Sequence, residues 1–150
     1  MSEVPLSERL IGTWRLVSRE DRTASGERRI DPSLGADPIA LLVYDRGGNF
    51  AAQFMKRDRQ SMLPAPAGAA GPNNSRAVGG YDAYFGSYTV DDVAGTVTQR
   101  LLGALSPDNV GLVLTRSMRV SGDELVIQLD TASVGDGTPV VRTLRWTRAG

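Results

Sequence analysis

Residues 39–56, IALLVYDRGGNFAAQFMK, predict a β-hairpin. Two apolar runs, 39–44 and 49–56, flank a short link that contains Gly47 and Gly48, residues that tolerate the positive φ angles of a tight turn. Strands joined by so short a link pair antiparallel, because a parallel crossover needs about a dozen residues or more. The hairpin therefore indicates an antiparallel sheet.

Similar strand-forming runs continue on both sides of the hairpin, separated by Gly, Asp, Asn, Ser and Pro. They cover residues 12–22, 27–31, 83–90, 96–105, 111–120, 124–131 and 139–148. A meander of about nine strands has two edges, and closure into a barrel pairs these edges with each other. We expect an all-β antiparallel barrel of about 8–10 strands, with short helical turns near residues 5–11 and 74–79.

Length and composition indicate a single domain and argue against several classes of function. The 150 residues fit a single barrel domain over 1–150, and 17 basic against 17 acidic residues leave no net charge to attract nucleic acid or an anionic membrane. The chain has no Cys and no His, which removes thiolate and imidazole catalysis, disulfides and the usual zinc site. No acidic cluster has metal-loop spacing, so we expect neither a metal nor a cofactor.

The N-terminal residues bear on the location of the protein, and its net charge and strand ends bear on its partners. Residues 1–10 contain Glu3, Glu8 and Arg9 without an apolar run, which argues against a secretory signal or membrane anchor and favours the cytoplasm. Zero net charge and exposed strand ends are compatible with a homodimer.

Three segments resemble the bacterial lipocalin-like domain family, within the wider lipocalin and calycin group of barrels. These segments are GTWRLVS at 12–18, LVYDRGGNFAAQ at 42–53 and YDAYFGSYTVD at 81–91. The resemblance runs over nearly the whole chain and implies a lipocalin-like barrel. In the wider group, the Trp of the first strand closes one end of the barrel and an Arg of the last strand lies across its ring. Trp14 matches that Trp, and Arg145 and Arg148 are the candidates for the Arg.

Alternation of side chains predicts which residues face the barrel interior, because successive residues of a strand point to opposite faces. We expect an inward face on every strand that carries an apolar series. The inward residues are then Trp14, Leu16 and Ser18; Tyr84, Gly86, Tyr88 and Val90; Val97, Gln99 and Leu101; Leu112, Leu114, Arg116, Met118 and Val120; and Val140, Arg142, Leu144 and Trp146.

An interior of this kind is apolar with a few polar groups, which is typical of a small-molecule site. The candidate ligand-binding residues are Tyr44, Gln53, Tyr84, Tyr88, Gln99, Arg116, Met118 and Arg142. Arg116 stands out because a buried guanidinium needs an acceptor and the inward sets offer few carboxylates. Each residue also has a structural reading: the tyrosines as rim packing, Gln99 as a partner of a neighbouring strand, and Arg116 as a side chain that reaches the surface.

The acidic pairs and the Pro-rich segment are interpreted as turn and loop residues. Asp91-Asp92, Glu20-Asp21 and Asp130 lie at predicted turns or strand ends, where solvated carboxylates are common. Residues 64–72, rich in Pro, Ala and Gly, predict a loop that is either a surface connection or a lid over the barrel.

Two functions and a third, purely structural role are open. A binding protein would hold a small, largely apolar metabolite, aromatic or polyketide-like, with Arg116 and the tyrosines at its polar end. An enzyme of the same shape would be a cofactor-free cyclase or isomerase of natural-product biosynthesis, in which Arg116 and Tyr84 activate a carbonyl. A structural or protein-binding barrel would use neither residue.

Overall fold

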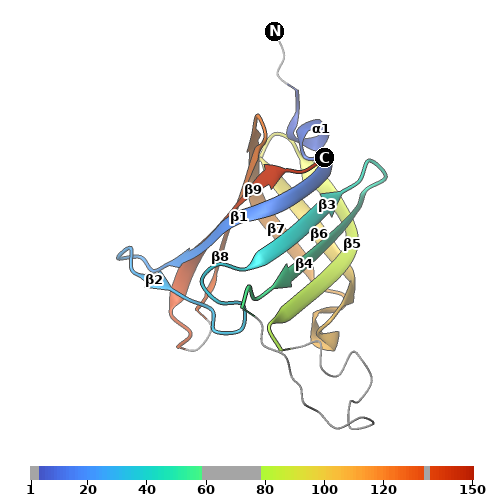
Figure 1. Cartoon of the computed structure of the whole chain (residues 1–150). Coiled ribbons are helices and arrows are strands. Elements are labelled where there is room, and N and C mark those ends of the chain that lie inside the picture. The colour runs from blue at the N-terminus through green and yellow to red at the C-terminus, as the bar shows by residue number, and fades with distance from the viewer. Residues whose placement is uncertain (1–3, 59–78, 134–135) are drawn as a thin grey trace, which may run out of the picture.

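Nine strands and two short helical segments make up the described part of the chain in the computed structural model, which is residues 4–58, 79–133 and 136–150 (Figure 1). In order they are α1 (Leu6–Arg9), β1 (Gly12–Arg22), β2 (Arg28–Arg29), β3 (Ile39–Tyr44), β4 (Asn49–Met55), β5 (Tyr81–Asp91), β6 (Thr96–Ala104), the 3-10 turn η1 (Pro107–Asn109), β7 (Val113–Ser121), β8 (Glu124–Ala132) and β9 (Pro139–Arg148).

The strands form one closed antiparallel barrel. Their order is β2-β1-β3-β4-β5-β6-β7-β8-β9, and an additional pairing of β1 with β9 joins the two ends. In Figure 1 β1 runs between β9 and β3, while β2 extends to one side. Eight strands therefore close the barrel, β2 adds a short ladder to the far end of β1, and the predicted meander is confirmed.

Most strand limits follow the sequence pattern, and the differences have local causes. The second strand shrinks to Arg28–Arg29, and β7 starts at Val113 because Gly111 and Leu112 instead exchange backbone hydrogen bonds with Leu101. The helical turn expected near residues 5–11 is α1. Residues 74–78 of the second expected turn and the segment 64–72 lie outside the described residues.

One end of the barrel is closed by Trp14. Its indole N–H donates to the Leu10 carbonyl at 2.9 Å, and both side chains are fully buried. The Arg148 guanidinium lies 4.3 Å from the centroid of the Trp14 ring and donates to the carbonyls of Arg9 and Ile11. Arg148 is thus the residue across the Trp ring, whereas Arg145 lies on the outer surface.

A β-bulge at Val17 changes the alternation along β1. The register with β9 runs Leu16 to Trp146 and then Ser18 to Arg145, so one residue of β1 is unpaired. Beyond the bulge the predicted faces exchange. Ser18, expected inside, pairs with the outward Arg145, and Arg19, expected outside, points inward with Asp21.

The other predicted inward faces are largely confirmed. Val97, Gln99 and Leu101 are buried on β6, and the inward faces of β7 and β9 have the expected parity. Leu112 is the exception: it precedes β7 and is 41% exposed.

Candidate functional site

A cavity of about 440 Å³ lies inside the barrel, within the range of roughly 300–1,000 Å³ that is usual for small-molecule sites. Residues of eight strands line it, together with residues of the β2–β3 connection, which lies at the end of the barrel opposite α1 (Figure 1), and residues of the η1 region. Its lining is Arg19, Asp31, Ser33, Leu34, Leu42, Tyr44, Phe54, Tyr81, Asp82, Tyr84, Gln99, Ser106, Asn109, Arg116, Met118, Ile127, Leu129, Thr131, Ala132, Arg142, Leu144 and Trp146.

Apolar side chains form much of this wall. Phe54 and Trp146 meet edge to face with ring centroids 5.8 Å apart, and Ile127 and Leu144 belong to the same buried cluster. The indole Nε1 of Trp146 is buried and has no hydrogen-bond partner among the described residues. A flat, apolar ligand would find aromatic and aliphatic contacts here.

A buried hydrogen-bonded trio crosses the interior at Tyr44. The Gln99 amide donates to the Tyr44 hydroxyl at 2.6 Å, and that hydroxyl donates to the sulfur of Met118 at 3.8 Å. Burial raises the pKa of Tyr44 well above its ordinary value, so the phenol is neutral. Each of these three side chains has its hydrogen-bond partner within the trio. The trio therefore links β3, β6 and β7, and it also lines the cavity.

Arg116 and Tyr84 contribute polar groups with hydrogen-bonding capacity that the described residues do not use in full. Arg116 is half-buried, its one hydrogen bond within the described chain goes to the Thr115 carbonyl at 3.4 Å, and it forms no ion pair there. The Tyr84 hydroxyl has no hydrogen bond to a described residue, and burial raises the pKa of Tyr84 to about 12. At neutral pH the cavity therefore presents a guanidinium and a protonated phenol as donors.

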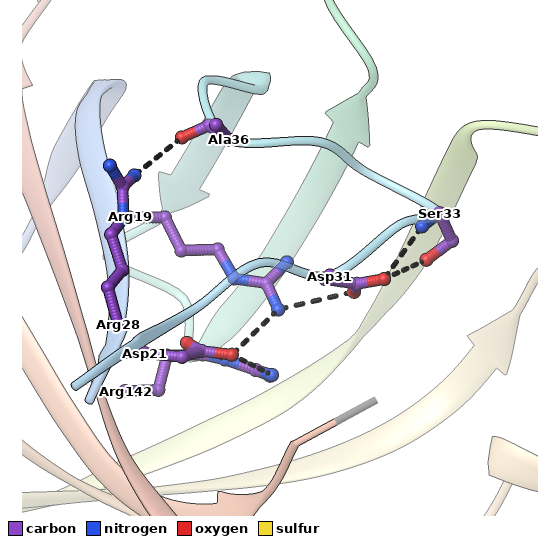
Figure 2. A network of polar contacts seen from close by, with 7 residues as sticks. All are labelled: Arg19, Asp21, Arg28, Asp31, Ser33, Ala36 and Arg142. Carbon is purple, nitrogen blue, oxygen red and sulfur yellow. Dashed lines mark hydrogen bonds and ion pairs between the residues drawn. The ribbon is translucent and has the colours of Figure 1, made fainter. Parts of the chain in front are cut away.

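Charged side chains are paired at the open end of the barrel (Figure 2). Arg142 binds Asp21 through two hydrogen bonds, at 2.9 and 3.0 Å. Arg19 lies between Asp21 and Asp31, with nitrogen to oxygen distances of 3.5 and 3.2 Å, and Ser33 donates to the other oxygen of Asp31. The expectation of a solvated Asp21 is wrong: its side chain is 4% exposed, because the Val17 bulge turns it inward.

Asp82 is a cavity residue that the sequence interpretation missed. It is half-buried on β5, and burial raises its pKa despite the hydrogen bond from the Ala83 N–H and the nearby Arg19. The available signal was its spacing, since Asp82 lies two residues before the inward Tyr84 on one strand.

The structure brings six of the eight predicted ligand-binding residues to the cavity. These six are Tyr44, Tyr84, Gln99, Arg116, Met118 and Arg142. Gln53 was expected inside, but it lies on the outer face of β4, where the Tyr81 hydroxyl donates to it; β4 buries Phe50, Ala52 and Phe54 instead. Tyr88 packs against Tyr44 and donates to the Asp45 carbonyl at 2.6 Å, away from the cavity lining.

The closed barrel and its cavity define a class of protein in which a meander of antiparallel strands encloses space for a small ligand. The family model described as a lipocalin-like domain matches residues 11–149, and the chain belongs to this family. No curated protein matches the chain.

Neither a metal-binding cluster nor a membrane-spanning helix is present among the described residues. No group of three or more Asp or Glu side chains there is arranged to hold a metal ion. Within the same residues, no helix has both the length and the apolar character needed to cross a membrane.

Proposed function

We propose that this barrel binds a small, largely apolar molecule, aromatic or polyketide-like, with an oxygen of the ligand at Arg116 and Tyr84. The observation that carries the proposal is a 440 Å³ cavity with apolar and polar lining in which, among the described residues, Arg116 has no carboxylate partner and the Tyr84 hydroxyl has no hydrogen bond. The family, whose barrel fold is compatible with such binding, supports it.

The charge arrangement supports Arg116 as the residue that meets the ligand. Arg19 and Arg142 also line the cavity, but Asp21 and Asp31 already accept their hydrogen bonds. A half-buried guanidinium without a carboxylate gains most from an incoming oxygen, because hydrogen bonds to charged groups stabilise by about 1.5–3 kcal/mol.

Binding is tested with bicyclic aromatic probes, 2-tetralone and 2-naphthoic acid, by isothermal titration and by tryptophan fluorescence, since Trp146 lines the cavity. We expect wild-type protein to bind at least one probe and Arg116→Met to bind it about tenfold or more weakly. Arg119→Met is the matched control, because Arg119 lies outward on the same strand. Equal affinity in both variants would remove Arg116 from the site, and binding of neither probe by wild type would contradict the proposal.

A second function, a cofactor-free isomerase or cyclase, is favoured by the same pair of donors. A neutral phenol and a guanidinium directed at one carbonyl oxygen stabilise the negative charge that develops there in such reactions. In this function Arg116 and Tyr84 are catalytic, and the walls hold the substrate in a reactive conformation. Tyr84→Phe then lowers turnover while the barrel remains folded.

A further inference from the structure

Asp82 differs from the other carboxylates around the cavity. Asp21 accepts two hydrogen bonds from Arg142, and Asp31 accepts from Arg19 and Ser33. Asp82 forms no ion pair with a described residue, and the Ala83 N–H donates to it. It is therefore a half-buried carboxylate with capacity left to accept a proton.

The strand geometry aligns Asp82 with the donor pair. On β5, Asp82 pairs with Phe54 and Tyr84 with Ala52, and both of these β4 residues face inward, so the two β5 side chains share the interior face. Arg116 reaches the same cavity from β7. One cavity thus presents a proton acceptor and two donors from two strands of the barrel.

The surroundings make Asp82 a stronger base than an exposed aspartate. Burial raises its pKa, and Asp31 acts in the same direction, while the positive charge of Arg19 opposes it. Tyr84 lies beside it on β5, and Arg116 and Arg142 line the cavity from β7 and β9. A carboxylate that holds a proton more tightly than an exposed aspartate is suited to general base catalysis.

We propose that the cavity is a site of proton transfer next to a carbonyl group, with Asp82 as the base and Tyr84 and Arg116 as the groups that hold the carbonyl oxygen. The inference rests on the proposed binding of a small molecule in this cavity. It specifies the ligand class as ketones or related carbonyl compounds with a hydrogen on the adjacent carbon.

The proposed step balances without a cofactor. Asp82 takes the proton from the adjacent carbon, the C–H electron pair forms a carbon–carbon double bond, and the carbonyl π pair moves to the oxygen. The enolate oxygen accepts hydrogen bonds from the Tyr84 hydroxyl and the Arg116 guanidinium. Return of the proton from the Asp82 carboxylic acid to the same carbon regenerates the ketone, and its return to another carbon of a conjugated enolate gives an isomer.

Deuterium exchange tests the step directly. The full chain is incubated with 2-tetralone in D₂O, and mass spectrometry follows deuterium uptake at the carbons beside the carbonyl; binding of 2-tetralone is measured separately by titration. We expect exchange above the buffer rate that falls about 100-fold or more in Asp82→Asn, in keeping with the contribution of a positioned base. Tyr84→Phe is expected to slow exchange while Asp82 still supports it.

The control and the pH profile separate catalysis from structure. Asp108→Asn removes an exposed carboxylate in η1 outside the cavity lining, and we expect its exchange rate to equal that of wild type. The rate of deuterium exchange above the buffer rate at the same pH should rise with pH in wild type as Asp82 loses its proton. Asp82→Asn should lack that rise. Asp82→Glu keeps a carboxylate and should retain part of the rate.

The outcomes distinguish this inference from the proposed function. Bound 2-tetralone without exchange above buffer, or equal exchange in wild type and folded Asp82→Asn, overturns the proton-transfer proposal and leaves binding intact. If neither 2-tetralone nor 2-naphthoic acid binds, the proposed function fails as well.

Discussion

Arg148 illustrates why single residues in this barrel are chemically specific. Its guanidinium stacks 4.3 Å from the Trp14 ring centroid while two of its nitrogens donate to the carbonyls of Ile11 and Arg9. A planar, forked cation can make all three contacts at once, whereas the ammonium of Lys is a compact point charge. The residue therefore fixes the segment before β1 against the closed end.

We predict that Arg148→Lys lowers the free energy of unfolding by about 1–3 kcal/mol, because two partly buried carbonyls lose donors and the Trp14 ring loses a stacked cation. Urea unfolding monitored by tryptophan fluorescence measures the change. Arg145→Lys is the matched control on the same strand, since the Arg145 side chain is 46% exposed, and it should change stability by less than about 0.5 kcal/mol. Equal stability of Arg148→Lys and wild type would show that the fork contributes nothing.

At the residue scale, the sequence predicted the cavity-lining residues correctly on strands in which the alternation of side chains is regular. Arg116, Met118 and Gln99 face inward because β7 and the inner part of β6 keep a period of two. Arg19 and Asp21 were misplaced because one unpaired residue reverses the parity beyond it, and no residue of the β1 sequence marks where that happens. Asp82 was missed because its strand begins at Tyr81, before the predicted limit at Ala83.

Among the elements, the connection between β2 and β3 depends on buried charges for its position at the open end. Leu34 packs in the core, Arg19 reaches Asp31, and Arg28 donates to the Ala36 carbonyl at 3.1 Å (Figure 2). The sequence predicted this region only as a link of turn-forming residues between the runs 27–31 and 39–44. The ion pair between Arg19 and Asp31 was not predicted, because Arg19 faces inward only as a result of the bulge in β1.

Acid should loosen this connection through Asp31. Although burial alone would raise its pKa, hydrogen bonds from Ser33 and the charge of Arg19 hold the pKa of Asp31 below its ordinary value. A lowered folded-state pKa contributes stability above the unfolded pKa of about 3.9, and this contribution is lost as pH falls through the folded value. We predict that Asp31→Asn loses about 1–3 kcal/mol at neutral pH and that its deficit against wild type shrinks below about pH 4.

Urea unfolding at a series of pH values measures this prediction. Asp37→Asn, on the same connection, is the control, because Asp37 pairs with Arg57 at the surface, and it should change stability by less than about 0.5 kcal/mol. A deficit in Asp31→Asn that stays constant down to pH 2 would contradict the assigned role of the carboxylate.

For the whole molecule, the pairing of β1 with β9 joins the two ends of the chain. Trp14 pairs with Arg148 and Arg22 with Val141, so the contacts that close the barrel bridge most of the sequence. The sequence predicted this closure from the number and order of strands. It could not predict the cavity volume, because that depends on how side chains from all eight strands meet.

We predict that refolding is slow for a chain of this size. Closure requires contacts at large sequence separation, and all-β proteins of this kind fold in about milliseconds to seconds. Stopped-flow dilution from urea with tryptophan fluorescence measures the rate, since Trp14 and Trp146 lie at the closing pair of strands. Complete refolding within microseconds would show that the closing contacts do not limit folding.

The bulge at Val17 divides β1 into two stretches in which the alternation of inward and outward residues is opposite. The end of the barrel closed by Trp14 and the end that carries Arg19 and Asp21 therefore belong to separate stretches of the strand. Deletion of Val17 would restore regular alternation with the register to β9 unchanged, so Arg19 and Asp21 would still lie opposite Leu144 and Arg142 and face inward. Shortening β1 by this one residue would thus leave the cavity lining intact, whereas adding one residue after Ser18 would exchange the inner and outer faces of the strand beyond it.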